Sequence, residues 1–411
     1  MLRCGLLGEK LGHSYSAQIH AMLGGYEYKM YEKSHEEVME FLKGGDWDAL
    51  NVTIPYKKLA ASVCDALSET SASLGSANTL VRRDGKLYGY NTDYFGFSSM
   101  LAKSRVDVKG KKALVLGSGG VGVTVCAVLK SLGAVPVTIS RSGENNYSNL
   151  YLHGDAGIIV NATPVGMYPK NGISPIDLRD FPDCAGVFDL IYNPLRTSLM
   201  LQAEELGIPH MSGLHMLVAQ AKKSSELFLG ITIPDDVTDR IENTLSESLG
   251  NISLIGMPGC GKTTVAQLLA NRLGRELIDT DAEIEKCAGM SIPQIFSEKS
   301  EGEFRRLESL AIGEAGKKSG KIISTGGGCV TIPENYPLLH QNGVIVWIKR
   351  DTCVLPTDGR PISLSSDMSE LYKRREPMYR RFCDFEVDND GTPEDTADKI
   401  IRLISEDGRG E

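Results

Sequence analysis

Residues 256–263 read GMPGCGKT, which matches the phosphate-binding pattern G-x-x-x-x-G-K-[ST] at every fixed position. The apolar run 252–255 precedes the motif, and residues 265–269 follow it with helical spacing. A buried strand, a glycine-rich loop and a helix in this order predict backbone N–H groups that wrap nucleotide phosphates. The motif therefore predicts nucleotide-dependent phosphoryl transfer, and it begins a new domain in the middle of the chain.

Each part of this loop has an expected task. Lys262 is expected to span the β- and γ-phosphates, and the Thr263 hydroxyl is expected to bind Mg²⁺. The nucleotide-binding residues predicted here are Gly259, Cys260, Gly261, Lys262, Thr263 and Thr264.

The bulk properties limit the possible classes of protein. The chain has 411 residues, which predicts two or three domains, with boundaries near residue 105 and within residues 231–250. Its net charge is -9 and no long basic run appears, so no nucleic-acid partner is expected. Nine dispersed cysteines without a C-x-x-C pair, and no apolar stretch of membrane-spanning length, predict a cytoplasmic protein with no membrane partner.

Short apolar runs alternate with amphipathic stretches along the chain. Residues 113–116 and 135–139 read as buried strands, and residues 123–132 read as a helix between them. This alternation predicts α/β architecture with parallel sheets.

A second glycine-rich loop marks a dinucleotide site. The strand 113–116 runs into GSGGVG at residues 117–122, a variant of the G-x-G-x-x-G pattern, and the next helix is expected to open at about Val123. The next strand ends in Ser140 and Arg141, where NAD sites usually place an acidic residue. A guanidinium beside a hydroxyl suits a 2′-phosphate, which favours NADP; the alternative is a surface arginine at a strand end. The residues predicted to hold the cofactor are Gly117, Gly119, Gly120, Gly122, Ser140 and Arg141.

Polar residues gather at predicted strand ends in the first hundred residues. Residues 51–57, NVTIPYK, read as an apolar strand that ends in a lysine, and residues 12–16 read GHSYS. Residues 75–79, GSANT, and 89–93, GYNTD, flank a predicted hairpin whose turn is Asp84-Gly85. Ligands of α/β proteins collect at strand ends, so these side chains are candidates for a substrate site.

These segments occur in order with residues 161–167 (NATPVGM), 192–194 (YNP) and 213–220 (GLHMLVAQ). Together they resemble shikimate dehydrogenase over about residues 1–245. The resemblance implies an α/β substrate-binding domain at 1–104 and a Rossmann NADP-binding domain at 105–245 whose last helices return to the substrate domain. It also implies NADPH-dependent reduction of 3-dehydroshikimate, with Lys57 and Asp93 as the catalytic pair and Gly213 near the cofactor. The substrate residues implied are Ser14, Ser16, Thr53, Asn78, Tyr192 and Gln220.

The proposed chemistry suits these residue types. Hydride attack on a ketone builds negative charge on oxygen, which a lysine ammonium can stabilise and protonate. The alternatives are a solvated Lys57, Asp93 as a helix N-cap, and the two serines as turn residues. The chain departs from the family pattern at Ala17, where proline is usual, at Ala21, where asparagine is usual, and at Ser140, which replaces an asparagine before the arginine.

Four further segments follow the phosphate-binding loop. Residues 276–281, ELIDTD, read as a strand that delivers two carboxylates, although these could instead cap a helix at 282–288. EFRRLE at 303–308 opens a helix, STGGGC at 324–329 ends a buried strand, and RREPMY occupies 374–379. With an Arg-Pro pair at 360–361, this set resembles shikimate kinase over about residues 250–405.

The resemblance implies a P-loop domain of the nucleoside monophosphate kinase type at 250–411. Asp281 is implied as the base that also binds shikimate hydroxyls, and Asp279 as a Mg²⁺ residue beside Thr263. The implied carboxylate site consists of Arg305, Gly327, Gly328 and Arg375, and Arg360 is implied to reach the phosphates from a lid. The lid stretch 353–359 lacks the arginine that the family usually packs on adenine.

These patterns predict a bifunctional enzyme of aromatic amino-acid biosynthesis. NADPH, ATP and Mg²⁺ are the expected cofactors, and 3-dehydroshikimate and shikimate the expected small-molecule partners. One rival interpretation is a catabolic quinate/shikimate dehydrogenase that uses NAD, and the other is a degenerate P-loop module with a regulatory role. The oligomeric state is left open by the sequence.

Overall fold

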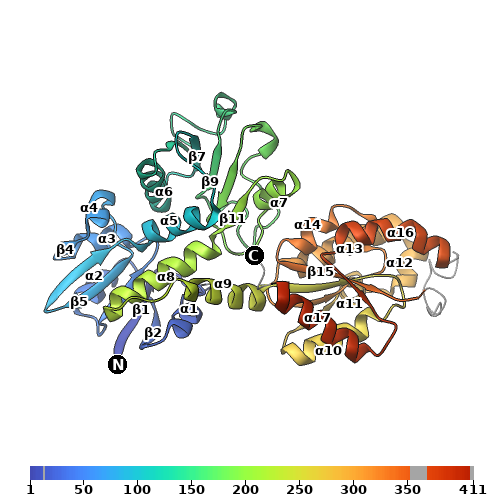
Figure 1. The fold of residues 1–411 in the computed structure, drawn as a ribbon. Coiled ribbons are helices and arrows are strands. Elements are labelled where there is room, and N and C mark those ends of the chain that lie inside the picture. Colours follow the sequence, from blue (N-terminus) through green and yellow to red (C-terminus); the bar gives the residue numbers. More distant parts are fainter. Residues whose placement is uncertain (13, 352–367, 408–411) are drawn as a thin grey trace. The chain divides into compact units, whose positions relative to one another are not determined.

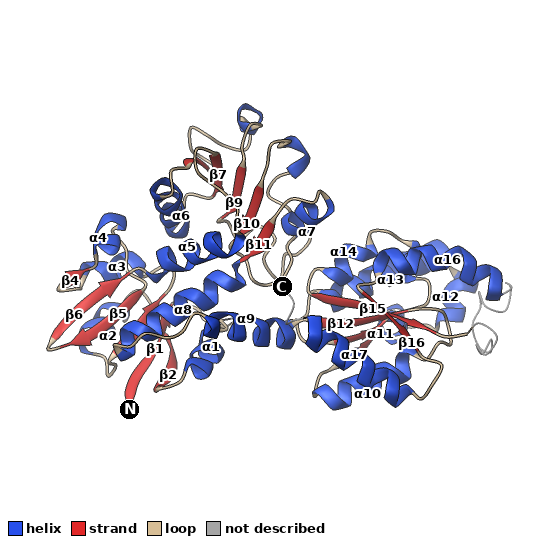
Figure 2. Cartoon of the chain, viewed as in Figure 1, coloured by secondary structure: helices blue, strands red, loops and turns tan. Residues whose placement is uncertain are grey.

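The structure is a computed structural model that describes residues 1–12, 14–351 and 368–407. The Arg360 expectation and the lid stretch 353–359 therefore lie outside the described residues. The chain forms two compact units, and three separate sheets run through them (Figures 1 and 2). The first unit comprises Met1–Val165, Ser174–Tyr192 and Gln202–Glu242, and the second comprises Gly166–Ile173, Asn193–Leu201 and Asn243–Glu411. The division into three domains stays a prediction, whereas the α/β fold class is confirmed.

The first sheet is mixed, with the strand order β2-β1-β3-β5-β6-β4. The strands β1, β2 and β3 run parallel, and β5 and β6 form the predicted hairpin. Asp84 and Gly85 both have positive φ, 52° and 74°, as the tight turn between such strands requires. The strands are β1 (Leu2–Gly8), β2 (Tyr26–Glu32), β3 (Ala49–Val52), β4 (Ala66–Leu67), β5 (Thr79–Arg83) and β6 (Lys86–Tyr90). The helices of this segment are α1 (Ser16–Leu23), α2 (Val38–Gly44), α3 (Lys57–Ser62), α4 (Glu69–Leu74) and α5 (Thr92–Ser104).

The second sheet is fully parallel, with the order β11-β10-β9-β7-β8. Its central strands are buried along their length, so they read as continuous apolar runs in the sequence. The strands are β7 (Lys112–Leu116), β8 (Val135–Ile139), β9 (Ile158–Asn161), β10 (Gly186–Asp189) and β11 (His210–Ser212). The helices along this part of the chain are α6 (Gly120–Ser131), α7 (Ser198–Glu205), α8 (Gly213–Leu229) and α9 (Asp236–Leu249).

The third sheet is also parallel, with the order β13-β14-β12-β15-β16, so the strand before the phosphate-binding loop is central. A core that includes Leu254, Ile323 and Val346 packs around it. The strands are β12 (Asn251–Ile255), β13 (Leu277–Asp279), β14 (Ile322–Ser324), β15 (Gly343–Lys349) and β16 (Phe385–Asp388). The helices are α10 (Lys262–Leu273), α11 (Thr280–Ala288), α12 (Ile292–Glu298), α13 (Glu301–Gly316), α14 (Asn335–His340), α16 (Met368–Phe382) and α17 (Pro393–Asp407).

Three expected element boundaries are wrong. The strand predicted to end in Lys57 stops at Val52, and Lys57 instead begins α3; Pro55 lacks the N–H group that a longer ladder would need. Asp281 lies in the first turn of α11 and not on a strand. The helix expected from Val123 begins at Gly120, because the glycine loop itself supplies the first turn.

The described helices include none that is both long enough and apolar enough to cross a membrane.

Candidate functional site

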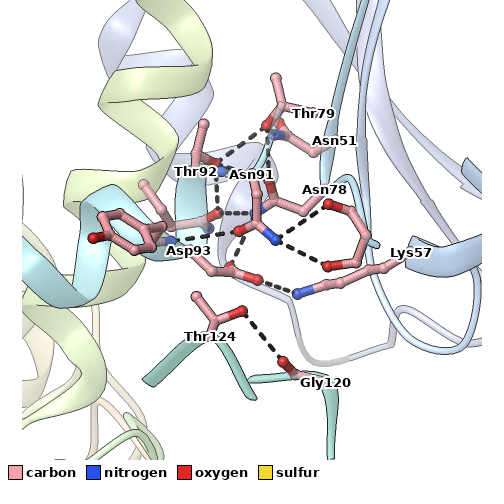
Figure 3. A network of polar contacts seen from close by, with 12 residues as sticks. Asn51, Lys57, Asn78, Thr79, Asn91, Thr92, Asp93, Gly120 and Thr124 are labelled. Carbon is pink, nitrogen blue, oxygen red and sulfur yellow. Dashed lines mark hydrogen bonds and ion pairs between the residues drawn. The ribbon is translucent and has the colours of Figure 1, made fainter. Parts of the chain in front are cut away.

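The predicted catalytic pair of the first unit is assembled by two helix starts. Lys57 is the first residue of α3, and Asp93 lies in the first turn of α5. Lys57 Nζ lies 2.5 Å from Asp93 Oδ2, and the two point toward each other in Figure 3. Only 21% of the lysine side chain and 11% of the aspartate side chain are exposed. Lys57 is thus paired and not a solvated charge, and the N-cap of α5 is Asn91 and not Asp93, so both alternatives are wrong.

Asn78 and Gln220 join this pair through one amide. Asn78 Nδ2 donates to Asp93 Oδ1 over 2.9 Å and to Gln220 Oε1 over 3.3 Å. The other side of the same amide is fixed, because Asn78 Oδ1 accepts from the Thr92 N–H group over 2.7 Å. Four of the predicted residues, from α3, α5, α8 and the segment before β5, are therefore brought together.

A buried group of hydroxyls supports this site, and the sequence did not identify it. Ser224 Oγ lies 2.9 Å from Thr79 Oγ1 and 3.1 Å from Thr92 Oγ1, and it accepts from Asn51 Nδ2 over 2.7 Å. Figure 3 shows Asn51, Thr79 and Thr92 around Asn78. The group fixes which way the Asn78 amide faces. A signal did exist, since Ser224 follows Gln220 by one helical turn and the others lie within or beside the polar segments.

The predicted serine pair forms a separate group. Ser14 Oγ donates to Ser16 Oγ over 2.9 Å, and Ser16 begins α1. Among the described residues, no hydrogen bond joins the two serines to the Lys57 group. The ring centroids of Tyr15 and Tyr192 lie 5.6 Å apart. Burial is the larger cause of the raised pKa of Tyr192, and the neighbouring Tyr15 is the smaller one. Thr53 directly follows β3 and begins the turn that leads to α3, and its N–H group donates to the Leu7 carbonyl over 2.9 Å.

The dinucleotide loop has the close contacts that its glycines predict. Gly117 has a φ of 111°, and a Cβ there would lie 2.9 Å from the Ala162 carbonyl oxygen. A Cβ at Gly122 would lie 2.3 Å from the Gly117 carbonyl oxygen, so only glycine permits this approach of helix and strand. Gly119 is the N-cap residue of α6 and Gly120 its first residue, which leaves the N-terminal N–H groups of the helix available to an anion.

The residues expected to select the cofactor follow β8. The Ser140 N–H group donates to the Asn145 carbonyl over 3.1 Å, which forms a tight loop. Arg141 is exposed at this loop, and it has no ion pair with any residue that the structure describes. Its guanidinium is thus available to a 2′-phosphate. Gly213 begins α8, and a Cβ there would lie 2.2 Å from the Leu190 carbonyl oxygen, so packing alone already requires glycine.

The phosphate-binding loop of the second unit lies between β12 and α10, as the motif predicts. Its residues line a pocket of about 560 Å³. Lys262 Nζ donates to the carbonyl oxygens of Gly256 and Met257 over 2.9 and 3.0 Å. The Thr263 hydroxyl donates to Asp279 Oδ2 over 3.4 Å, which places the two predicted metal residues side by side.

The two carboxylates at the junction of β13 and α11 differ in role. Asp279 is the N-cap of α11, where its side chain accepts from the N–H groups of Asp281 and Ala282. Asp279 thus caps α11 through Oδ1 while its Oδ2 contacts the Thr263 hydroxyl, and its Mg²⁺ role stays a prediction. Asp281 lines the pocket, and its Oδ1 is buried without a hydrogen bond. Burial, and then repulsion from Asp279, raises the pKa of Asp281, which suits a group that must accept a proton.

Arg305 is held by a carboxylate that the sequence did not assign. Its Nη1 donates to Glu308 Oε2 over 2.7 Å, and the Glu308 side chain is fully buried. Burial raises the pKa of Glu308, although Arg305 counteracts it. A Cβ at Gly328 would lie 2.3 Å from Arg305 Nη1, so the glycine leaves room for the guanidinium. The signal was the i, i+3 spacing of an arginine and a glutamate within one helix.

Arg375 and Tyr379 meet on the glycine loop after β14. Arg375 Nη1 and the Tyr379 hydroxyl both donate to the Gly327 carbonyl, over 3.0 and 2.5 Å. Both side chains come from α16, one helical turn apart, and Tyr379 is fully buried. The sequence identified Arg375 but gave Tyr379 no role; this tyrosine fixes the loop that the arginine also contacts.

One cluster in the first unit has the composition of a metal site. Ligand atoms of His215, Asp239 and Glu242 lie within 4.8 Å of one another. Lys103 Nζ, however, donates to both carboxylates over 2.9 Å. The lysine ammonium already supplies positive charge at this position, so the cluster gives no reason to expect a metal ion.

Comparison with known proteins assigns the Lys57–Asp93 site and the phosphate-binding pocket to two known families. A family model described as shikimate dehydrogenase substrate binding domain matches residues 6–80. The shikimate dehydrogenase (NADP(+)) of Clostridium perfringens strain SM101 is 33% identical over 263 residues, which cover 59% of this chain and 97% of that protein. The chain belongs to the shikimate dehydrogenase family. A family model described as shikimate kinase matches residues 258–405, so the chain also carries a shikimate kinase domain.

Solved structures agree with the shikimate dehydrogenase assignment. A chorismate mutase/shikimate 5-dehydrogenase fusion protein from Clostridium acetobutylicum is 36% identical, with a TM-score of 0.56, and the match covers 59% of this chain and 97% of that chain. The shikimate 5-dehydrogenase from Thermus thermophilus in complex with NADP(H) and shikimate is 28% identical, with a TM-score of 0.54, and the match covers 59% and 99%. The resemblance to shikimate dehydrogenase and to shikimate kinase that the sequence predicts is therefore confirmed.

Proposed function

We propose that this chain is a bifunctional enzyme that reduces 3-dehydroshikimate to shikimate with NADPH and then phosphorylates shikimate with Mg-ATP to shikimate 3-phosphate. The observation that carries the proposal is the presence, in one chain, of the Lys57–Asp93 pair and of a phosphate-binding pocket that contains Asp281. Incubating the full chain with 3-dehydroshikimate, NADPH and Mg-ATP tests it directly. Mass spectrometry is expected to detect shikimate 3-phosphate, and its absence would contradict the proposal.

The reduction needs a proton donor at the ketone oxygen. When bound, the reduced nicotinamide supplies the hydride, and the oxygen gains a negative charge that must be neutralised. Lys57 Nζ donates the proton to that oxygen, and Asp93 keeps the ammonium in place from 2.5 Å away. Asn78 and Gln220 are proposed to bind ring hydroxyls in exchange for the 3.3 Å contact that they make with each other.

Arg141 is proposed to select NADP over NAD. We expect Arg141→Ala to raise the KM for NADPH by roughly 10- to 100-fold, because a charge-assisted contact with the 2′-phosphate is lost. The KM for NADH should change little, since NADH lacks this phosphate. Steady-state kinetics with both cofactors measure the change, and Arg105→Ala, at the exposed end of α5, serves as a control. An equal change of the KM for NADPH and for NADH in the variant would favour the catabolic alternative. Oxidation of quinate with NAD by the unmodified chain that is faster than the reaction with NADP would favour it too.

The phosphorylation needs a base and an anchored substrate. Asp281 is proposed to accept the proton of the attacking hydroxyl while Thr263 and Asp279 hold Mg²⁺. Arg305 and Arg375 are proposed to bind the shikimate carboxylate from α13 and α16, a geometry that planar guanidinium groups suit. The first reaction creates the hydroxyl group that the second reaction phosphorylates, and this supports the pairing of the two activities in one chain.

The raised pKa of Asp281 predicts the pH dependence of the kinase reaction. The base must be ionised, so phosphorylation falls as the pH drops through the pKa of Asp281. Because that pKa lies above the ordinary aspartate value, kcat/KM for shikimate should begin to fall at a higher pH than an ordinary aspartate would give. A pH profile at saturating Mg-ATP measures this limb. A kinase profile that stays flat down to the ordinary aspartate range would contradict a raised pKa for the base.

We also propose a reducing compartment such as the cytoplasm. The eight cysteines in the described part of the chain are all free, which supports this location.

A further inference from the structure

Arg350 lies at the edge of the sheet that carries the phosphate-binding loop. The strands β12 and β15 are parallel neighbours, with Ile255 paired to Trp347. The loop begins one residue after Ile255, and Arg350 follows Trp347 by three residues, so both lie at the carboxyl ends of adjacent strands. Arg350 accordingly lines the same pocket as Gly259 and Lys262.

No carboxylate in the described part of the chain pairs with the guanidinium of Arg350. Within residues 1–12, 14–351 and 368–407 it makes no hydrogen bond or ion pair, and its Nε is buried without a partner. A shielded N–H group without an acceptor is unfavourable, so this arrangement calls for an anion from outside the chain. Its neighbour Lys349 differs, because Lys349 Nζ lies 3.4 Å from Glu386 and 3.3 Å from Asp388.

The other cations of the pocket are already engaged. Lys262 donates to loop carbonyls, Arg305 is paired with Glu308, and Arg375 donates to the Gly327 carbonyl. Arg350 is the one pocket cation, among the described residues, that is left without any such contact.

We propose that Arg350 binds the terminal phosphates of the nucleotide in the kinase pocket. This inference rests on the kinase activity proposed above. Arg350 directly follows β15, the strand beside the one that leads into the phosphate-binding loop, so the nucleotide is the favoured ligand. The proposed shikimate carboxylate site lies elsewhere in the pocket. There, Arg305 and Arg375 reach from helices onto the loop that contains Gly327 and Gly328. A guanidinium can contact two phosphate oxygens at once, and it would neutralise charge that the loop amides leave uncompensated.

The test uses the full chain with Arg350→Met and Arg350→Gln. Calorimetric titration with Mg-ADP and with a non-hydrolysable ATP analogue, Mg-AMPPNP, is expected to show roughly 10- to 100-fold weaker binding of at least the analogue in both variants. A larger loss with Mg-AMPPNP than with Mg-ADP would assign the contact to the γ-phosphate, and equal losses would assign it to the β-phosphate. The KM for shikimate should stay unchanged.

Lys349→Met is the matched control, because it removes the adjacent positive charge outside the pocket; it should leave nucleotide binding unchanged. Ketone reduction by the same protein reports whether each variant is folded. Unchanged affinity for both nucleotides in the Arg350 variants would overturn the inference while the kinase activity stands, as would a raised KM for shikimate alone. Failure of the unmodified chain to bind either nucleotide would instead overturn the proposed kinase function, and the inference with it.

Discussion

Lys57→Ala should lower kcat for ketone reduction by about 10²- to 10⁴-fold, the usual contribution of a positioned general acid. The ammonium lies 2.5 Å from Asp93 and is largely buried, so nearby water offers no equivalent donor. Phosphorylation by the same protein should be unchanged, because Lys57 belongs to a different compact unit from the phosphate-binding loop. Oxidation of NADPH in the presence of 3-dehydroshikimate measures the first activity, and release of ADP in the presence of shikimate measures the second.

Lys58→Ala is the matched control for this variant. Lys58 is the next residue of α3, and it is exposed, so its removal tests the effect of one positive charge at the same helix start. It should leave both activities intact. An equal loss of both activities in Lys57→Ala would contradict independent sites, and normal reduction would remove Lys57 from the mechanism.

Features determined by local sequence could be predicted well. The phosphate-binding loop, the dinucleotide loop and the Asp84-Gly85 turn each depend on glycines whose backbone conformation or close contacts other residues cannot adopt. The parallel strands were visible because buried strands of such sheets are continuous apolar runs. The structure therefore agrees with the sequence on fold class and on the places where phosphates are expected to bind.

Features determined by tertiary contacts could not be predicted from pattern alone. The start of α3 at Lys57 depends on how the turn after β3 packs, and Ile54 in that turn is 75% exposed although it reads as part of an apolar strand. Glu308 appears in the sequence as one charge among several on a helix. Only burial and the contact with Arg305 distinguish it from the half-buried Glu303.

The supporting residues show the same limit. Ser224 and Tyr379 carry common side chains at unremarked positions, and their roles arise from partners far away in the sequence, such as Asn51 and Gly327. Directly acting residues could be proposed from motifs, because their chemistry restricts the residue type. Residues that hold them in place have no such restriction and emerge from the structure.

Lys262→Ala should lower kcat for shikimate phosphorylation by about 10²- to 10³-fold, the loss expected when a preorganised charge at the reacting phosphate is removed. Among the described residues, the ammonium contacts the backbone carbonyls of Gly256 and Met257 and the Cys260 sulfur, and it pairs with no carboxylate. No buried carboxylate is therefore left unpaired by the substitution, and the protein should fold. Reduction of 3-dehydroshikimate by the same chain should remain normal and so serves as an internal measure of folding.

Lys286→Ala separates the effect of this particular ammonium from a general change in charge. Lys286 lies on α11 of the same unit with 77% of its side chain exposed, so its removal should leave phosphorylation unchanged. Kinase turnover that survives in Lys262→Ala would mean that the loop does not hold the transferred phosphate, and the second activity would have to be withdrawn. Loss of phosphorylation together with intact reduction, against an unaffected Lys286→Ala, would place the phosphoryl transfer at the loop between β12 and α10.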